Sequence, residues 1–410
     1  MPDDIGRREF LKRGTVAGVA VGTGLGRQSA DVRDFRERGN PLAPEVRHSR
    51  EGGNPFSQAP ESPSDLAMRR LDSKEFCLSE YDALKPALSF SATTPSAAKQ
   101  WQQQARRRLI ERMGGFPATR APLNAESLET KDFGTYTREK ILFDTRHNLT
   151  ALGYLLIPKA ASGAKVPAVV CLSGHGRGVV DILGMNDDGT QRAERNVAYA
   201  KEYAVQCVEH GYVTFAVEQL AIGARRDDAA RKAGPAQDSC RPAACAAVLL
   251  GQSMAAWRTW DAMRAIDYLE TRPEVDATRI ATMGASGGGT TSLLTGATDE
   301  RVKLAMVSAY FNTFRDSIVS ISHCPDNYVP GLLTDMEMHD IAGLVAPRFL
   351  FVESGRNDRI FPIAGSQVAA AKAKDLYACF GVPDHFGYAI HEGAHEFDGV
   401  AAFAFMRQWL

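Results

Sequence analysis

The amino-acid sequence predicts an α/β fold: a mostly parallel central sheet with an N-terminal antiparallel hairpin and helices on both faces. Two β-rich runs, at residues 136–143 and 149–157, flank a polar turn and predict the hairpin. After them, short apolar runs alternate with helical patterns, which is typical of parallel strands buried on both faces. With 410 residues, 44% of them hydrophobic, the chain can bury one large core and carry an extension.

The apolar runs that predict parallel strands lie at residues 168–172, 212–217, 280–283, 304–307, 349–352 and 386–390. The clearest helix between them covers residues 254–269, where Ala256, Trp260 and Met263 share one face. Pro273 follows this helix and stops it. A hairpin followed by alternating strands and helices assigns the main domain to residues 131–410.

Residues 1–30 predict a twin-arginine export signal. Arg7 and Arg8 precede Phe10 and a weakly apolar, glycine-rich run at residues 14–26. That run is too short to span a bilayer comfortably. We therefore expect a periplasmic or secreted protein, exported by the twin-arginine pathway and without stable membrane insertion afterwards. The alternative is an ordinary basic N-terminus.

Two segments of different character separate this signal from the main domain. Residues 31–65 are polar and proline-bearing with few apolar side chains to bury, so they predict a disordered linker. Residues 66–130 predict a helical extension packed on the main domain. Its clearest helix covers residues 97–113 and ends at Gly114 and Gly115.

Ser286 is the candidate nucleophile of the chain. It lies at the centre of the G-x-S-x-G segment 284–288, directly after the apolar run at 280–283. A strand, a sharp turn and a helix in this order hold the serine on a strained backbone, with its Oγ exposed above the end of a sheet. Gly284 and Gly288 leave room where a side chain would clash with the neighbouring strand or helix. The match is short, so its meaning depends on the rest of the chain.

A base and an acid follow Ser286 in the order that such a serine requires. Asp358 comes in a tight turn after the run at 349–352, and His395 lies thirty-seven residues further on, after the run at 386–390. Acyl transfer by serine needs a histidine to take the hydroxyl proton and a carboxylate to orient that histidine. The chain order Ser286, Asp358, His395 therefore predicts a catalytic triad. Taken alone, Asp358 could equally cap a turn.

Backbone amides near two glycine-rich segments are the candidate oxyanion donors. The segment 174–178 follows the first parallel strand, and its glycines let N–H groups turn toward a bound carbonyl oxygen. By position we predict the amide of Arg177, or of Gly176, together with that of Gly287. His175 lies in the same segment, and we expect it to support the loop by hydrogen bonding.

Two histidine-bearing segments resemble metal motifs only superficially. His391 and His395 complete the H-E-x-x-H spacing of zinc proteases, which requires both on one helix and a third ligand. Here the pentad follows a strand-like run and contains Gly393, so we predict no zinc. The segment 323–331 predicts either a proline-fixed loop or a pocket wall; a metal role is weaker because no further ligands are spaced around it.

Cysteine usage and charge restrict the partners. The seven cysteines form no C-x-x-C pair, and Cys240 and Cys245 could form a small disulfide loop in an exported protein. The net charge is −1, so no global attraction to nucleic acid or to an anionic membrane follows.

The block from about residue 135 to 410 resembles the α/β-hydrolase superfamily, and more closely its dienelactone-hydrolase-like and acetylxylan-esterase-like bacterial branch. The segments that carry the resemblance are 174–178, 284–288, 355–362 and 393–396. The resemblance implies a nucleophile at Ser286, a base at His395, an orienting acid at Asp358, and no metal or organic cofactor. One departure concerns Glu218 and Gln219, where an aspartate and a glycine turn are expected after the run at 212–217; it leaves the substrate preference open.

The sequence therefore predicts an exported serine esterase that acts on a small-molecule or carbohydrate ester, with acetyl esters of carbohydrates favoured by the resemblance and by export. A lactonase or a serine peptidase would use the same triad. A non-catalytic binding protein on a hydrolase scaffold is the remaining alternative, and the set of triad and oxyanion elements argues against it.

Overall fold

The computed structural model describes residues 72–161 and 163–410. The predicted export signal at residues 1–30 and the predicted linker at 31–65 lie outside the described residues. Within the described part of the chain, no helix combines the length and apolar character needed to cross a membrane.

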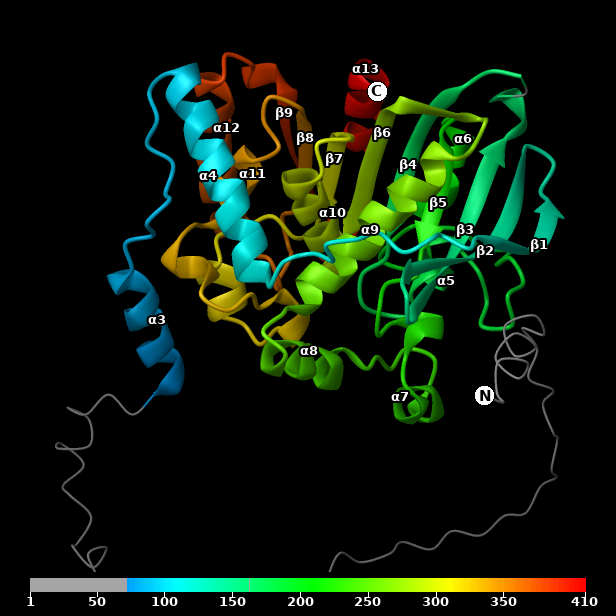
Figure 1. The fold of residues 1–410 in the computed structure, drawn as a ribbon, viewed down its shortest axis with the longest axis horizontal. Coiled ribbons are helices and arrows are strands. Elements are labelled where there is room, and N and C mark those ends of the chain that lie inside the picture. Colours follow the sequence, from blue (N-terminus) through cyan, green and yellow to red (C-terminus); the bar gives the residue numbers. More distant parts are fainter. Residues whose placement is uncertain (1–71, 162) are drawn as a thin grey trace, which may run out of the picture. The chain divides into compact units, whose positions relative to one another are not determined.

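A nine-stranded mixed sheet is the centre of the fold (Figure 1). Its strand order is β1-β2-β3-β5-β4-β6-β7-β8-β9. The strands are β1 (Glu126–Asp132), β2 (Tyr136–Arg146), β3 (Leu149–Pro158), β4 (Val166–Leu172), β5 (Val213–Val217), β6 (Val275–Ala285), β7 (Val302–Ser308), β8 (Phe349–Gly355) and β9 (Phe386–His391).

The first three strands pair antiparallel with one another, and β3 also pairs antiparallel with β5. From β5 to β9 every neighbouring pair in the sheet is parallel. The carboxyl ends of these parallel strands therefore meet at one edge of the sheet, where ligand sites of open α/β sheets lie. The predicted hairpin and the predicted parallel strands are all present.

Helices cover both faces of the sheet (Figure 1). One face packs against α6 (Tyr203–Glu209) and α13 (Val400–Trp409), and the other against α9 (Met254–Glu270), α10 (Gly287–Thr298) and α12 (Ile363–Cys379). The remaining helices are α3 (Ser73–Ala83), α4 (Pro95–Met113), α5 (Val179–Ile182), α7 (Asp228–Ala233), α8 (Cys240–Leu249) and α11 (Met338–Gly343). The short helical turns are η1 (Lys159–Ala161), η2 (Gly223–Arg225), η3 (Arg315–Val319), η4 (Pro325–Asn327), η5 (Leu332–Thr334) and η6 (Pro383–His385).

Strand β4 shows why its sequence is apolar at every position. Val169 and Cys171 belong to one hydrophobic core, whereas Val170 and Leu172 belong to the core on the opposite face. Successive side chains of a strand point to opposite faces, so a strand covered on both sides alternates between two cores. The continuous apolar runs in the sequence follow from this geometry.

Helix α4 is the main element of the predicted helical extension. Gln102 and Leu109 on this helix are buried, and Gln102 Nε2 donates to the backbone oxygen of Gly343 at 2.9 Å. The helix ends at Gly114, which adopts φ 93° and a left-handed conformation. The region predicted as helical also contains the start of β1, which lies at the sheet edge, and five of its seven residues are exposed. A largely exposed edge strand has no alternating apolar pattern that could reveal it.

Candidate active site

Ser286 occupies a sharp turn between β6 and α10. Its backbone has φ 56° and ψ −124°, a region that costs a non-glycine residue energy and is frequent at functional sites. The Ser286 amide donates to the backbone oxygen of Ser308 in β7 at 3.0 Å, which fixes the turn against the sheet. A Cβ on Gly284 would lie 2.2 Å from the backbone of Gly288, and one on Gly288 would lie 1.9 Å from the oxygen of Leu172. The close packing of strand and helix therefore requires both glycines.

Asp358 and His395 come together beyond the ends of β8 and β9. His395 Nδ1 lies 2.8 Å from Asp358 Oδ2. The other oxygen, Oδ1, accepts from the amides of Ile360 at 2.7 Å and Phe361 at 3.0 Å. These amides and the 5% exposure of Asp358 fix the carboxylate in place. With Nδ1–H donated to Asp358, His395 keeps Nε2 as its acceptor, as a general base requires.

Two aromatic rings pack against the imidazole of His395. Tyr199 stacks on His395 with ring centroids 6.1 Å apart, and Phe361 stacks on it at 5.8 Å. Tyr199 also accepts a hydrogen bond from the amide of Gly174. A Cβ on Gly174 would lie 2.4 Å from Tyr199 Oη and 3.1 Å from Ser286 Cβ. Tyr199 thus connects the environments of His395 and Ser286, and no local motif in the sequence indicates this.

The H-E-x-x-H pentad has the wrong geometry for a zinc-protease helix. His391 is the last residue of β9, and residues 392–396 form bends rather than a helix. His391 Nδ1 accepts from the amide of Gly393 at 3.2 Å, whereas His395 Nδ1 contacts Asp358. The two rings therefore do not present a shared pair of ligands.

Gly287 and the segment after β4 carry the backbone amides that the sequence predicts as oxyanion donors. The Gly287 amide lies in the first turn of α10, where N–H groups have no acceptor within the helix. The amide of Arg177 donates to Asp181 Oδ2 at 2.9 Å, so this conformation commits it to that carboxylate. Among the hydrogen bonds of the described residues, the amides of His175 and Gly176 donate none. A Cβ on Gly287 would lie 3.3 Å from His175 Nδ1, which places the two segments in contact.

Glu218 and Gln219, the two residues after β5 that depart from the expected sequence pattern, form hydrogen bonds with neighbouring segments of the site. Glu218 accepts from the amides of Val179 at 3.0 Å and Ala224 at 3.1 Å. Burial raises the pKa of Glu218 to about 7, and these two amides lower it only in part. Gln219 Nε2 donates to the oxygen of Ser173, and its Oε1 accepts from Thr291 Oγ1 at 2.6 Å. The loop after β5 therefore connects the segment after β4 to α10.

Glu353 accepts hydrogen bonds from the backbone of the segment that follows His395. This residue of β8 is 2% exposed and accepts from the amides of Asp398 at 2.9 Å and Gly399 at 3.1 Å. Its Oε1 also accepts from Ser308 Oγ at 2.8 Å. Burial raises the pKa of Glu353. The carboxylate thus links the ends of β7 and β8 to the chain just after His395.

The disulfide between Cys240 and Cys245 that the sequence left open does not form in this structure, where both cysteines are free. Both residues lie on α8, where Cys240 is buried and Cys245 is exposed, so their side chains do not meet. Cys240 instead faces Cys324, which lies just before η4. A hydrogen bond with Cys324 is the main cause that lowers the pKa of the Cys240 thiol to about 6, and the charge of Arg258 adds to it.

The sheet order, the turn at Ser286 and the segments that carry Asp358 and His395 define an α/β-hydrolase. A model of the Abhydrolase family matches residues 64–392. The chain belongs to this family. The matched region contains Ser286 and Asp358 and ends just before His395, so the assignment of His395 rests on the hydrogen bond to Asp358.

Two relatives of known sequence are also named as a hydrolase and an esterase. YtaP of Bacillus subtilis (strain 168), provisionally named a hydrolase, is 25% identical over 314 residues, covering 74% of this chain and 98% of the relative. The 4-O-methyl-glucuronoyl methylesterase of Phanerochaete carnosa is 27% identical over 215 residues, covering 46% of this chain and 51% of the relative. This chain therefore matches about half the length of that methylesterase.

A solved structure from Bacteroides fragilis, provisionally described as an acetyl xylan esterase, superposes with a TM-score of 0.64 at 19% identity. The match covers 79% of this chain and 83% of the other. It shows that the two chains share a fold. The predicted α/β-hydrolase is confirmed, and the predicted class of enzyme, a carboxylic ester hydrolase, agrees with the esterase names among these proteins.

Proposed function

We propose that this carboxylic ester hydrolase works through Ser286, His395 and Asp358. The observation that carries the proposal is the 2.8 Å contact between His395 Nδ1 and Asp358 Oδ2, in a site whose strained turn presents Ser286. Ser286 Oγ attacks the ester carbonyl while His395 Nε2 takes its proton. His395 then gives that proton to the leaving alcohol, and water repeats the sequence to release the acid.

The tetrahedral oxyanion would be bound by the amide of Gly287 and by one amide of the segment after β4. The sequence offered Gly176 or Arg177 as this second donor. The hydrogen bond from Arg177 to Asp181 favours Gly176, or the neighbouring amide of His175. Each such donor lowers the barrier by several kcal/mol, on the order of 10²–10³ in rate.

We propose carbohydrate esters as the substrates, with acetyl esters as the first candidate. The support is the shared fold with the Bacteroides fragilis structure, together with the predicted export. A second candidate is the methyl ester of a glucuronoyl group, which is supported by the Phanerochaete carnosa methylesterase. In the first case the sugar supplies the alcohol of the ester, and in the second the sugar supplies the acid.

A substrate panel tests these assignments. Purified protein is assayed on acetylated xylo-oligosaccharides, a methyl glucuronate, simple acetyl esters, lactones and peptides, with Ser286→Ala as the control. We expect hydrolysis of at least one sugar ester and a fall in kcat on the order of 10⁶ in the variant, as for other triad serines. Equal turnover by Ser286→Ala would reject the nucleophile, whereas activity confined to lactones or peptides would reject the ester proposal and keep the triad.

Export by the twin-arginine pathway is also a proposal, supported by Arg7, Arg8 and the weakly apolar run that follows them. Changing both arginines to lysine is expected to leave the precursor in the cytoplasm. Fractionation of cells that express each form measures this, and normal export of the double variant would rule the pathway out.

A further inference from the structure

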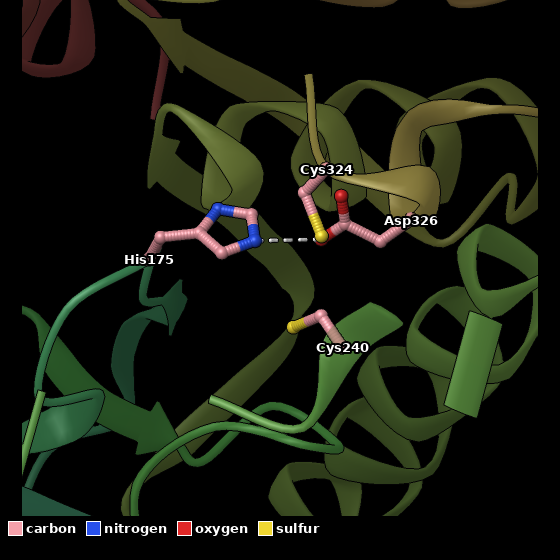
Figure 2. A group of neighbouring side chains, drawn as sticks. All are labelled: His175, Cys240, Cys324 and Asp326. Carbon is pink, nitrogen blue, oxygen red and sulfur yellow. Dashed lines mark ion pairs between the residues drawn. The ribbon is translucent and has the colours of Figure 1, made fainter. Parts of the chain in front are cut away.

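Four side chains that can bind a metal ion converge next to the segment after β4. They are His175, Cys240, Cys324 and Asp326, and one ligand atom of each lies within 4.8 Å of every other. Figure 2 shows the Nε2 of His175 facing Cys324 and Asp326, with Cys240 beside them. The sequence pattern around Cys324 offered no further ligands nearby. The fold supplies two from distant segments, namely His175 after β4 and Cys240 at the start of α8.

The imidazole of His175 points into this cluster and faces the carboxylate of Asp326. Its Nε2 lies 3.1 Å from Asp326 Oδ2, an ion-pair distance drawn as a dashed line in Figure 2, but the two atoms are not aligned for a hydrogen bond. A metal ion would use the lone pair of Nε2 together with the two sulfurs and the carboxylate.

The charges around the cluster suit a divalent cation. Arg258 of α9 pairs with Asp326 through Nη1 and donates from Nη2 to Cys240 Sγ at 2.9 Å. The side chains of Arg258 and Asp326 are 3% and 2% exposed, so an unbalanced charge here would be costly. With His175 neutral, as a metal ligand must be, two thiolates and one carboxylate carry three negative charges, Arg258 carries one positive charge, and a divalent cation brings the sum to zero.

The geometry points to a structural zinc site formed by His175, Cys240, Cys324 and Asp326. One nitrogen, two sulfurs and one oxygen suit Zn²⁺, which prefers tetrahedral sites with nitrogen and sulfur ligands. Four protein ligands leave no open position, so the ion holds structure and takes no part in hydrolysis. Arg258 and the Nδ2 of Asn327, which donates to Asp326 Oδ1 at 3.0 Å, orient the ligands from outside.

A zinc ion here would join three segments around the active site. His175 belongs to the segment that contacts Gly287, and Cys240 begins α8. Asn327, next to Asp326, accepts from Thr290 Oγ1 in the first turn of α10 at 3.0 Å. Zinc would therefore hold the segment after β4 and the η4 loop against the helix that follows Ser286. A disulfide between Cys240 and Cys324 would leave the Nε2 of His175 facing only Asp326.

Metal content measured on the whole protein tests the site independently of any activity. Protein is produced with zinc in the medium, dialysed, and analysed by elemental mass spectrometry. We expect about one zinc per chain for a closed four-ligand site, and at least a tenfold lower content in Cys240→Ala and in Asp326→Asn. The matched control is Cys245→Ala, because Cys245 lies on the same helix but is exposed; it is expected to retain zinc.

Cobalt gives a second measurement that does not depend on the variants. Co²⁺ bound by two thiolates in a tetrahedral site is expected to show intense visible and near-ultraviolet absorption, and Zn²⁺ is expected to abolish it. Wild-type protein with neither zinc nor a cobalt spectrum after incubation with each ion would overturn the site. A Cys240–Cys324 disulfide found by non-reducing peptide mapping in zinc-free protein would overturn it in favour of a redox pair. Equal zinc in Cys240→Ala, Asp326→Asn and wild type would place the ion elsewhere.

Discussion

Ser286, Asp358 and His395 lie where three different strands end, and each was readable from its immediate neighbours. Glycines around a serine predict a tight turn, and a polar residue just after a buried strand predicts the edge of the sheet. Tyr199 carries no such signal. It lies far from any strand end in the sequence, and only the fold brings its ring against His395.

In the proposed triad Asp358 orients His395 through the 2.8 Å contact, so its charge and its acceptor oxygen are both required. Asp358→Asn is expected to keep the fold but to place an amide opposite His395 Nδ1, which favours the wrong tautomer. A fall in kcat on the order of 10⁴ follows, with a small change in KM. Steady-state kinetics on the best ester of the panel measure this effect. The exposed Asp384→Asn serves as control, and equal kcat for the two variants would remove Asp358 from the triad.

The helices and strands follow the sequence most closely where they are buried on both sides. Helix α9 begins at Met254 as predicted, directly after the Ser253 cap, and extends one residue beyond the predicted end, shortly before Pro273. Strand β1 was missed because its exposed edge position needs no apolar pattern. Burial, rather than local propensity, made the other strands readable.

Gly114 provides a test at the scale of one helix. Gly114 and Gly115 both have positive φ, but a Cβ on Gly114 would lie 2.5 Å from Gln252 Cα, whereas one on Gly115 would meet nothing within 4 Å. Alanine at either position must adopt a positive φ, which costs about 1 kcal/mol in both variants. Gly114→Ala is expected to lose at least about 1 kcal/mol more in the free energy of unfolding, because overpacking adds to that cost. Urea denaturation compares the two, and equal losses would contradict close packing at the end of α4.

At the scale of the whole molecule, the sequence could not show which distant residues meet. His175 and Cys240 lie far apart in the chain, and neither is near Asp326 in sequence. Local patterns report on strands, helices and turns, whereas the convergence of these side chains depends on sheet order. The sequence left the pairing of the two cysteines of α8 open for the same reason.

Buried carboxyl groups give the folded protein a defined pH dependence. Burial raises the pKa of Glu218 and that of Glu337 from 4.5 to about 7. Between these pH values the folded state keeps protons that the unfolded state has lost. The contribution of each group to stability is therefore complete below pH 4.5 and is lost as the pH rises through 7, by up to about 3 kcal/mol per group.

Glu218→Gln removes one of these two titrating groups. The free energy of unfolding of the variant is expected to fall less steeply between about pH 5 and pH 7 than that of the wild type, even if the variant is less stable overall. Urea denaturation across this range measures both slopes. The exposed Glu392→Gln is the control and should keep the wild-type slope. An unchanged slope in Glu218→Gln would show that Glu218 is ionised in the folded protein at all these pH values.

Covalent labelling with a fluorophosphonate tests the proposed catalytic serine most directly. The reagent reacts with a serine that an adjacent histidine activates, so intact-mass measurement and peptide mapping report both the reaction and its site. We predict one adduct per chain, located on Ser286, and a strongly reduced rate of labelling in His395→Ala. Wild-type protein that stays unlabelled, or that carries the adduct on another residue, would contradict a serine esterase centred on Ser286.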